Sequence, residues 1–480
     1  MVRKRTIYIY TDRPVGGVSP YIFGQFIEHL GRCIYGGIYV GEDSTIPNIK
    51  GFRKDVLEKV KAIRPSIIRW PGGNFVSGYH WEDGIGPKDK RPIRYDLAWG
   101  QEEPNQFGTN EFIEWVKLVG AEPYIVVNAG NGTPEEAARW VEYTNKDGGT
   151  YYSMLRKRYG YEKPFNVKIW GIGNELYGKW QVGYCIDGKE CARRTVEFAN
   201  EMKKVDPTIK LVAVGDADNS LWNYWMVRYA GEYFDYLSIH TYIHENPYLE
   251  HVAMSELIKT KIEDAYHMIR VGLKDAKLNK KIWIAYDEWN VWKREAVAIE
   301  HTQITNLSDA ILTAAILNTL IKMSSIVKMA NFAQTVNVLP LILTKDDGDI
   351  LLTPQYYVFY MYANNFGGKA LETKVDSDYY YSKTFEKYIE YIDVAATRDN
   401  DKVYVYIVNR DKDEDYECSL LVKNFDVKCI KHVILTSDDV KDKNDWNNKE
   451  KIKPVETERK EKLDSITIPK HSVNLLILEK

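Results

Sequence analysis

The 480-residue sequence contains few cysteines, and their spacing indicates neither a disulfide framework nor a metal site. The five cysteines are odd in number and include no Cys-x-x-Cys pair, which argues against a disulfide-rich scaffold or a zinc ribbon. Cys185 and Cys191 are close enough in the chain to pair, but we expect two reduced thiols.

Charge of one sign and long apolar runs are also missing. Sixty-five basic and 68 acidic side chains leave a net charge of −3, so no positive field attracts nucleic acid or a membrane surface. No run approaches the roughly 20 apolar residues of a membrane span. The basic N-terminal stretch MVRKRTIYIYTDRP is followed by no apolar signal segment. We therefore expect a cytoplasmic protein with no nucleic-acid or membrane partner.

The sequence does contain eight apolar, β-rich runs with helical patterns between them. Near-continuous apolar runs are typical of strands buried on both faces of a parallel sheet. Eight such units favour a (β/α)₈ TIM barrel; a doubly wound open sheet is the alternative, but the phosphate-binding glycine fingerprint is absent. The runs cover residues 21–29, 66–74, 123–130, 167–175, 210–215, 236–242, 281–290 and 326–334.

Helix signals lie between these runs. Residues 53–62 and 305–323 show apolar side chains at helical spacing, and Thr133-Pro134-Glu135-Glu136 supplies an N-cap, a proline at the first helical position and a capping-box glutamate.

The pattern changes near residue 362 to short alternating strands separated by polar turns. This change predicts a C-terminal antiparallel β-sandwich, jelly-roll-like, in which residues 4–11 take part as an additional strand. We expect a barrel domain over 19–361 and a sandwich domain over 1–18 plus 362–480, with the charged stretch 438–454 as a solvated loop.

Two glutamates follow apolar runs at positions where a barrel places its chemistry. KIWGIGNELYG (168–178) runs into Asn174–Glu175, and we expect its three glycines to leave room for a bound molecule. Glu288 ends the seventh run, beside Trp289. Because the fourth and seventh strands face each other across a barrel mouth, the two carboxylates can meet over one substrate. Glycoside hydrolysis requires such a pair, with one acid and one nucleophile or base.

The surrounding motifs resemble one family. GIGNELYGKW, IAYDEWNVW, FGQFIEHLGRCIYGGIY, IIRWPGGNFVSGYHWEDGIGP, VNAGNGTPEEAARWVEY and LSIHTY are similar to glycoside hydrolase family 51, the α-L-arabinofuranosidases. The resemblance covers essentially the whole chain. It implies an exo-acting retaining enzyme that releases terminal non-reducing arabinofuranosyl units from arabinan and arabinoxylan oligosaccharides by double displacement. It also implies a homo-oligomer, commonly a hexamer, with no cofactor.

The resemblance assigns roles to residues of this sequence. Glu175 is the expected acid/base, with a pKa raised by burial and by the charge of Glu288, the expected nucleophile. Asn174 is expected to bond the 2-hydroxyl of the sugar, Arg69 to orient a carboxylate and Trp99, in the long connection 76–108, to flank the scissile bond. The expected substrate-binding residues are Glu28, Arg69, Asn74, Trp99, Asn174, His240, Tyr242 and Gln334.

Other interpretations remain open for the same residues. Each polar side chain could be structural, and His240 could be a satisfied core histidine. His240 and His244, with nearby carboxylates, could imitate a metal site, although their spacing does not lie on a helix; we expect no metal. A β-xylosidase, an endoglucanase or a catalytically silent carbohydrate-binding protein are the competing functions. The segment 293–304 is shorter than in family members.

Overall fold

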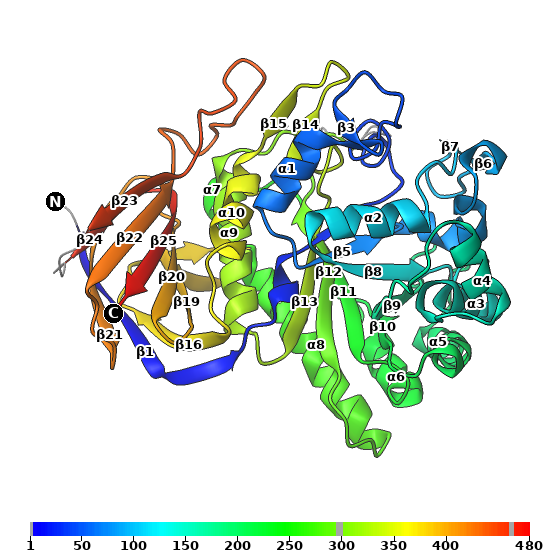
Figure 1. The fold of residues 1–480 in the computed structure, drawn as a ribbon. Coiled ribbons are helices and arrows are strands. Elements are labelled where there is room, and N and C mark those ends of the chain that lie inside the picture. Colours follow the sequence, from blue (N-terminus) through cyan, green and yellow to red (C-terminus); the bar gives the residue numbers. More distant parts are fainter. Residues whose placement is uncertain (1–2, 294–300, 460–464) are drawn as a thin grey trace.

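A computed structural model describes residues 3–293, 301–459 and 465–480 of the chain. A closed barrel and a curled, mostly antiparallel sheet lie side by side, and the first and last strands of the chain both belong to the curled sheet (Figure 1). Residues 294–300, which make up most of the shortened segment 293–304, lie outside the described residues. Among the helices of the described ranges, none combines the length and apolar character needed to cross a bilayer.

All eight predicted apolar runs form parallel strands of the barrel. Alternate residues serve its two faces: Tyr124 and Val126 belong to a cluster shared with other strands, whereas Ile125 and Val127 join the large core with the helices. This burial on both faces explains the near-continuous apolar pattern. The barrel is confirmed, and the doubly wound alternative is wrong. In order around the barrel the strands are β2 (Gly24–Phe26), β5 (Ile67–Trp70), β8 (Glu122–Val127), β9 (Ile169–Ile172), β10 (Lys210–Val214), β11 (Tyr236–Ile243), β12 (Trp283–Val291) and β13 (Val327–Ala333).

Helices surround the barrel and follow the predicted signals. The Thr133 hydroxyl accepts from the backbone N–H of Glu136, as an N-cap does, but the Glu136 carboxylate lies 3.0 Å from His80 Nδ1 and serves that side chain. The helices are α1 (Lys54–Ala62), α2 (Thr109–Val119), α3 (Pro134–Asn145), α4 (Tyr151–Arg158), α5 (Gly188–Val205), α6 (Ser220–Ala230), α7 (Tyr248–Val252), α8 (Ser255–Asp275), α9 (Leu307–Lys322) and α10 (Pro354–Ala363).

The second unit is one nine-stranded sheet that curls around its own apolar core. The predicted N-terminal strand is present: β1 pairs antiparallel with β16 and parallel with β21, so the sheet is mostly rather than wholly antiparallel. The predicted domain boundaries themselves stay predictions. In sheet order the strands are β23 (Val455–Arg459), β22 (Cys429–Leu435), β25 (Ser472–Glu479), β20 (Lys402–Asn409), β19 (Ile392–Arg398), β16 (Lys369–Val375), β1 (Arg3–Gly17), β21 (Tyr416–Lys423) and β24 (Ile466–Ile468).

The two units share a continuous hydrophobic core. Helices α9 and α10 lie between barrel and sheet (Figure 1), and the ring of Tyr362 in α10 stacks on Tyr406 of β20 at 4.4 Å. Ala370, Ala395 and Leu475 of the sheet belong to the same cluster as the barrel helices. Burial of this joint fixes the sheet against the barrel.

Short elements occupy the connections. The long connection 76–108 contains several short elements, and Trp99 lies between two of them, with its backbone N–H donating to Asp96 Oδ2 at 3.0 Å. The short elements are η1 (Pro20–Phe23), β3 (Asn48–Ile49), β4 (Phe52–Arg53), η2 (Asn74–Gly78), η3 (Trp81–Gly84), η4 (Lys88–Lys90), β6 (Arg94–Tyr95), β7 (Glu102–Glu103), β14 (Ile342–Thr344), β15 (Ile350–Leu352), β17 (Tyr379–Ser382) and β18 (Lys387–Glu390).

Candidate active site

A small pocket opens at the carboxyl ends of the barrel strands, where the polar residues were expected. Arg69, Asn174 and His240 do not line this pocket; they bond the lining side chains from behind. The other predicted site residues lie in its wall. The lining residues are Glu28, Leu30, Gly73, Asn74, Trp99, Glu175, Tyr242, Glu288, Trp292, His301, Gln334, Val338 and Leu339.

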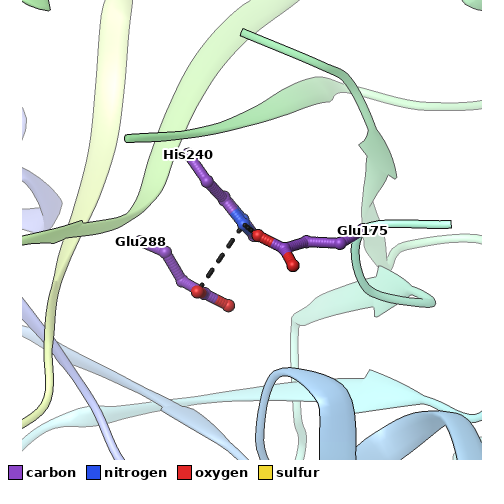
Figure 2. A group of neighbouring side chains, drawn as sticks. All are labelled: Glu175, His240 and Glu288. Carbon is purple, nitrogen blue, oxygen red and sulfur yellow. Dashed lines mark hydrogen bonds and ion pairs between the residues drawn. The ribbon is translucent and has the colours of Figure 1, made fainter. Parts of the chain in front are cut away.

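The two glutamates meet across the barrel mouth. A carboxylate oxygen of Glu175, a carboxylate oxygen of Glu288 and a ring nitrogen of His240 all lie within 4.8 Å of one another (Figure 2). Carboxyl groups about 5–5.5 Å apart can act as the acid and the nucleophile of a retaining glycosidase, whereas inverting enzymes keep a wider gap of roughly 6.5–9.5 Å for a water. The spacing fits the retaining arrangement.

Glu288 is held by an arginine and a tyrosine. Arg69 Nη1 donates to Glu288 Oε1 at 2.6 Å, and the Tyr242 hydroxyl donates to Glu288 Oε2 at 2.9 Å. Both partners of the ion pair are buried, so the charge-assisted bonds form in surroundings of low dielectric constant. These two bonds fix the position of the Glu288 carboxylate, one on each of its oxygens.

Glu175 has a strained backbone at the end of β9. Its φ of 43° lies in the left-handed region, which a glutamate rarely adopts, and such strain is concentrated at functional sites. The Gly178 N–H donates to the Glu175 carbonyl at 2.7 Å and closes a turn directly after it. The backbone thus turns the carboxylate back toward the barrel axis and His240.

The predicted rise in the pKa of Glu175 is wrong for the free protein. Burial raises the pKa of Glu175, but the hydrogen bond and the charge of His240 lower it more, so the pKa lies below its ordinary value. His240 Nδ1 lies 2.9 Å from Glu175 Oε1. Burial and the charge of Glu288 were the expected influences on this pKa, whereas the imidazole of His240, placed there by the fold, has the larger effect.

His240 is itself surrounded by carboxylates. Burial lowers the pKa of His240, but the charge of Glu288 and the bonds to Asp287 and Glu175 raise it to about 10. Its Nε2 lies 3.3 Å from Asp287 Oδ1 and 3.0 Å from Ser238 Oγ. The proton of the Glu175–His240 pair therefore rests on the imidazole in the free protein.

Asp287 is the carboxylate that contacts His240 on the side of its Nε2 atom. Burial raises its pKa, but the charge of Arg69 and the bonds from His240 and Ser238 lower it to about 2. The Tyr124 hydroxyl donates to Asp287 Oδ2 at 2.8 Å. Asp287 precedes Glu288 on β12, and both carboxylates face Arg69 and His240, because the pairing of β11 with β12 has a register shift at this point. Asp287 was not among the predicted site residues, because its bonds to Ser238 and Tyr124 depend on the fold.

Glu28 is a carboxyl of the pocket wall whose pKa is raised. Burial and the charge of Glu288 raise its pKa to about 8. Glu28 Oε1 accepts from Trp99 Nε1 at 3.1 Å, and Oε2 lies 2.9 Å from Gln334 Nε2. The expected sugar-binding residues Glu28, Trp99 and Gln334 are thus joined to one another.

The glycines around Glu175 do not have the predicted purpose. A Cβ on Gly171 would meet the Tyr124 hydroxyl at 3.0 Å, one on Gly173 would meet the Leu176 side chain, and one on Gly178 would meet the Trp180 ring. These glycines make room for protein side chains. Gly73 is the glycine at the pocket, since a Cβ there would lie 3.0 Å from Glu288 Oε1.

Aromatic rings form one wall of the pocket mouth. The His301 ring contacts Trp99 at 5.4 Å and Trp292 at 5.3 Å, and Trp292 contacts Tyr242 at 5.1 Å. Trp292 and His301 were not among the predicted site residues. The motif EWNVW carries a signal for Trp292, four residues after Glu288, whereas no sequence signal indicates His301.

The alternative metal site around His240 and His244 is not assembled among the described residues. His244 Nδ1 faces the Trp292 carbonyl at 3.2 Å, and His29 Nδ1 pairs with Glu103 at 2.8 Å. The Glu175, His240 and Glu288 atoms have a spacing that could hold an ion. Contacts among the side chains explain why these atoms lie close together, because His240 Nδ1 bonds Glu175 and lies 3.7 Å from Glu288 Oε2.

Comparisons with known proteins agree with this geometry. Residues 59–258 match the model of the alpha-L-arabinofuranosidase 1 domain, and residues 287–472 match the alpha-L-arabinofuranosidase C-terminal domain. The chain is 35% identical to a Bacillus subtilis protein named intracellular exo-alpha-(1->5)-L-arabinofuranosidase 1, over 93% of each chain.

Two solved structures extend the likeness to the whole fold. The alpha-L-arabinofuranosidase of Thermotoga maritima, solved as an arabinose complex, is 40% identical with a TM-score of 0.92, over 99% of this chain and 100% of that one. The thermostable GH51 alpha-L-arabinofuranosidase of Thermotoga petrophila is 41% identical with the same TM-score and coverage. The chain therefore belongs to glycoside hydrolase family 51 and is an α-L-arabinofuranosidase.

Proposed function

We propose that the protein is an exo-acting, retaining α-L-arabinofuranosidase that removes terminal non-reducing arabinofuranosyl units from arabinan and arabinoxylan oligosaccharides. The observation that carries this proposal is the closeness of the Glu175 and Glu288 oxygens, within 4.8 Å, in the wall of one small pocket. The cavity measures about 60 Å³. Sites that take up a whole drug-sized ligand measure roughly 300–1,000 Å³. A cavity this much smaller favours uptake of a single terminal unit of the sugar chain.

Glu288 acts as the nucleophile in this proposal. Its carboxylate attacks the anomeric carbon, the bond to the leaving oxygen breaks, and a covalent arabinosyl-enzyme forms. Arg69 and Tyr242 hold the Glu288 carboxylate in the wall of the pocket. A water then attacks the same carbon from the side of the departed group, the bond to Glu288 breaks, and arabinose leaves with the original configuration.

Glu175 acts as the acid and then as the base. In the free enzyme the proton of the pair lies on His240, as the directions of both pKa values indicate. Burial by itself favours the neutral carboxyl of Glu175. A substrate that displaces water from the pocket strengthens this preference and draws the proton from His240 to Glu175, which passes it to the leaving oxygen. Glu175 takes the proton back from the attacking water.

The remaining parts of the proposal concern the sugar contacts, the cellular location and the oligomeric state. Glu28, Asn74 and Gln334, which line the pocket, bond the arabinofuranosyl hydroxyls, while Trp99 flanks the leaving group. A cytoplasmic location is supported by the word intracellular in the name of the B. subtilis relative. A homo-oligomer, as the family resemblance implies, completes the proposal.

Product analysis tests the proposal. The enzyme is incubated with linear α-1,5-arabino-oligosaccharides and with arabinoxylo-oligosaccharides, and the anomer formed first is followed by NMR. We expect arabinose as the first product, as its α anomer, and no hydrolysis of 4-nitrophenyl β-D-xyloside or β-cellobioside. Shorter oligosaccharides formed by internal cleavage would exclude an exo enzyme, and initial β-arabinose would exclude retention.

A further inference from the structure

The Asn74 side chain ends a chain of hydrogen bonds whose direction is set by Arg69. A guanidinium can only donate. Arg69 Nη2 donates to Asn174 Oδ1 at 2.6 Å, which leaves Asn174 Nδ2 as the donor that faces Asn74 Oδ1 at 3.5 Å. The orientation of both amides follows from this order, because the reverse assignment would set a guanidinium N–H against an amide N–H.

Gln181 supplies a second donor to the same oxygen. Gln181 Nε2 donates to Asn74 Oδ1, and Gln181 Oε1 accepts from the Ser77 hydroxyl at 2.9 Å. The Gln181 side chain is buried, and its backbone N–H donates to the Gly178 carbonyl at 3.0 Å. Both ends of the Gln181 amide are thus bonded, so it cannot turn without losing a bond.

The consequence concerns the other end of the Asn74 amide. Asn74 Oδ1 faces two donors, whereas Asn74 Nδ2 has no protein acceptor among the residues in the described ranges. Asn74 lines the pocket. A rotated Asn74 amide would place its NH₂ group against the N–H donors of Gln181 and Asn174. The donor end therefore faces the sugar.

We propose that Gln181 is a positioning residue that fixes the Asn74 amide with its two N–H donors toward the arabinofuranosyl unit. The inference rests on the proposed role of Asn74 as a sugar contact. Gln181 lies on the loop that carries Glu175. This loop therefore also determines that the pocket prefers a hydrogen-bond acceptor of the sugar beside Asn74. A sugar is selected for a hydroxyl oxygen that can accept at this point.

A double-mutant cycle tests the inference. Gln181→Ala, Asn74→Ala and the double variant are compared with the wild type in arabinose binding by calorimetry and in kcat/KM on 4-nitrophenyl α-L-arabinofuranoside. A neutral hydrogen bond is worth about 0.5–1.5 kcal/mol, which is about 2- to 12-fold. We expect Gln181→Ala to weaken arabinose binding by about that factor in the wild type and by less than about 2-fold in the Asn74→Ala background.

Two further variants separate positioning from structure. Gln181→Met keeps the side-chain volume without the amide and should reproduce the result of Gln181→Ala. Gln106→Ala removes a partly buried glutamine whose side-chain amide, within the described ranges, bonds the carbonyls of Lys88 and Pro104, and it should leave arabinose binding unchanged. Unfolding midpoints accompany every variant.

Equal losses from Gln181→Ala with and without Asn74 would show a structural effect and overturn the inference, as would no loss in either background. Failure of the wild type to bind arabinose or to hydrolyse the aryl arabinofuranoside would instead overturn the proposed function.

Discussion

Glu28→Gln should change how the stability of the enzyme depends on pH. Glu28 is buried, and its pKa is raised from 4.5 to about 8. Below pH 4.5 the carboxyl is protonated in both the folded and the unfolded chain. Between pH 4.5 and 8 the unfolded chain releases the proton while the folded chain keeps it, so the free energy of unfolding falls as the pH rises through this window.

The size of the effect follows from the same two values. The difference between 4.5 and about 8, at about 1.4 kcal/mol for each pH unit, amounts to about 5 kcal/mol. Glutamine does not titrate, so Glu28→Gln removes this loss. The substitution also changes one hydrogen bond, because the amide N–H that replaces Glu28 Oε2 would face Gln334 Nε2. Rotation of the Gln334 amide relieves this conflict, since it turns toward the new N–H the Gln334 Oε1 atom, which has no partner among the described residues. This second effect does not depend on pH.

Urea unfolding at a series of pH values measures the prediction. The free energy of unfolding of Glu28→Gln minus that of the wild type should rise by several kcal/mol between pH 4.5 and 8 and then level off. Glu103→Gln is the control of opposite sign. Burial raises the pKa of Glu103, but His29 lowers it below its ordinary value, so the loss in that variant should be largest at neutral pH and shrink as the pH falls. A Glu28→Gln difference that is constant from pH 4.5 to 9 would refute the reasoning.

Three further outcomes are expected. Glu288→Ala should lose nearly all turnover, and added azide should not restore a product of retained configuration; near wild-type activity would end its assignment as nucleophile. Tyr242→Phe removes a hydrogen bond to a charged group, worth about 1.5–3 kcal/mol, so kcat/KM should fall by about 10- to 150-fold while the unfolding midpoint changes little. Dialysis against EDTA should leave the activity unchanged, and a loss that zinc or another divalent ion reverses would assign a metal to the Glu175, His240 and Glu288 atoms.

The fold was predictable because its signals are local and repeated. Strands buried on both faces must be apolar along their whole length, and eight such runs were visible. The parallel pairing of β1 with β21 was not, because the alternating pattern of a strand does not encode the direction of its neighbour.

The pocket residues were predictable to the extent that strand ends converge. Glu28, Glu175 and Glu288 all follow apolar runs, and their meeting is a property of the barrel. The pKa of Glu175 was not predictable in this way, since its direction depends on the orientation of the His240 ring. Gln181 lies in a loop, and only the folded chain shows that it bonds Asn74.

The covalent intermediate offers the most direct test of the central claim that Glu175 and Glu288 work as an acid and a nucleophile. In Glu175→Ala, an aryl arabinofuranoside with an easily departing phenol can still form the intermediate, but its hydrolysis lacks a base. Mass spectrometry of the quenched and digested variant should find an arabinosyl group on the peptide that contains Glu288. A group found instead on Glu28 or another carboxylate, or the absence of any adduct while inverted β-arabinose accumulates, would contradict the account.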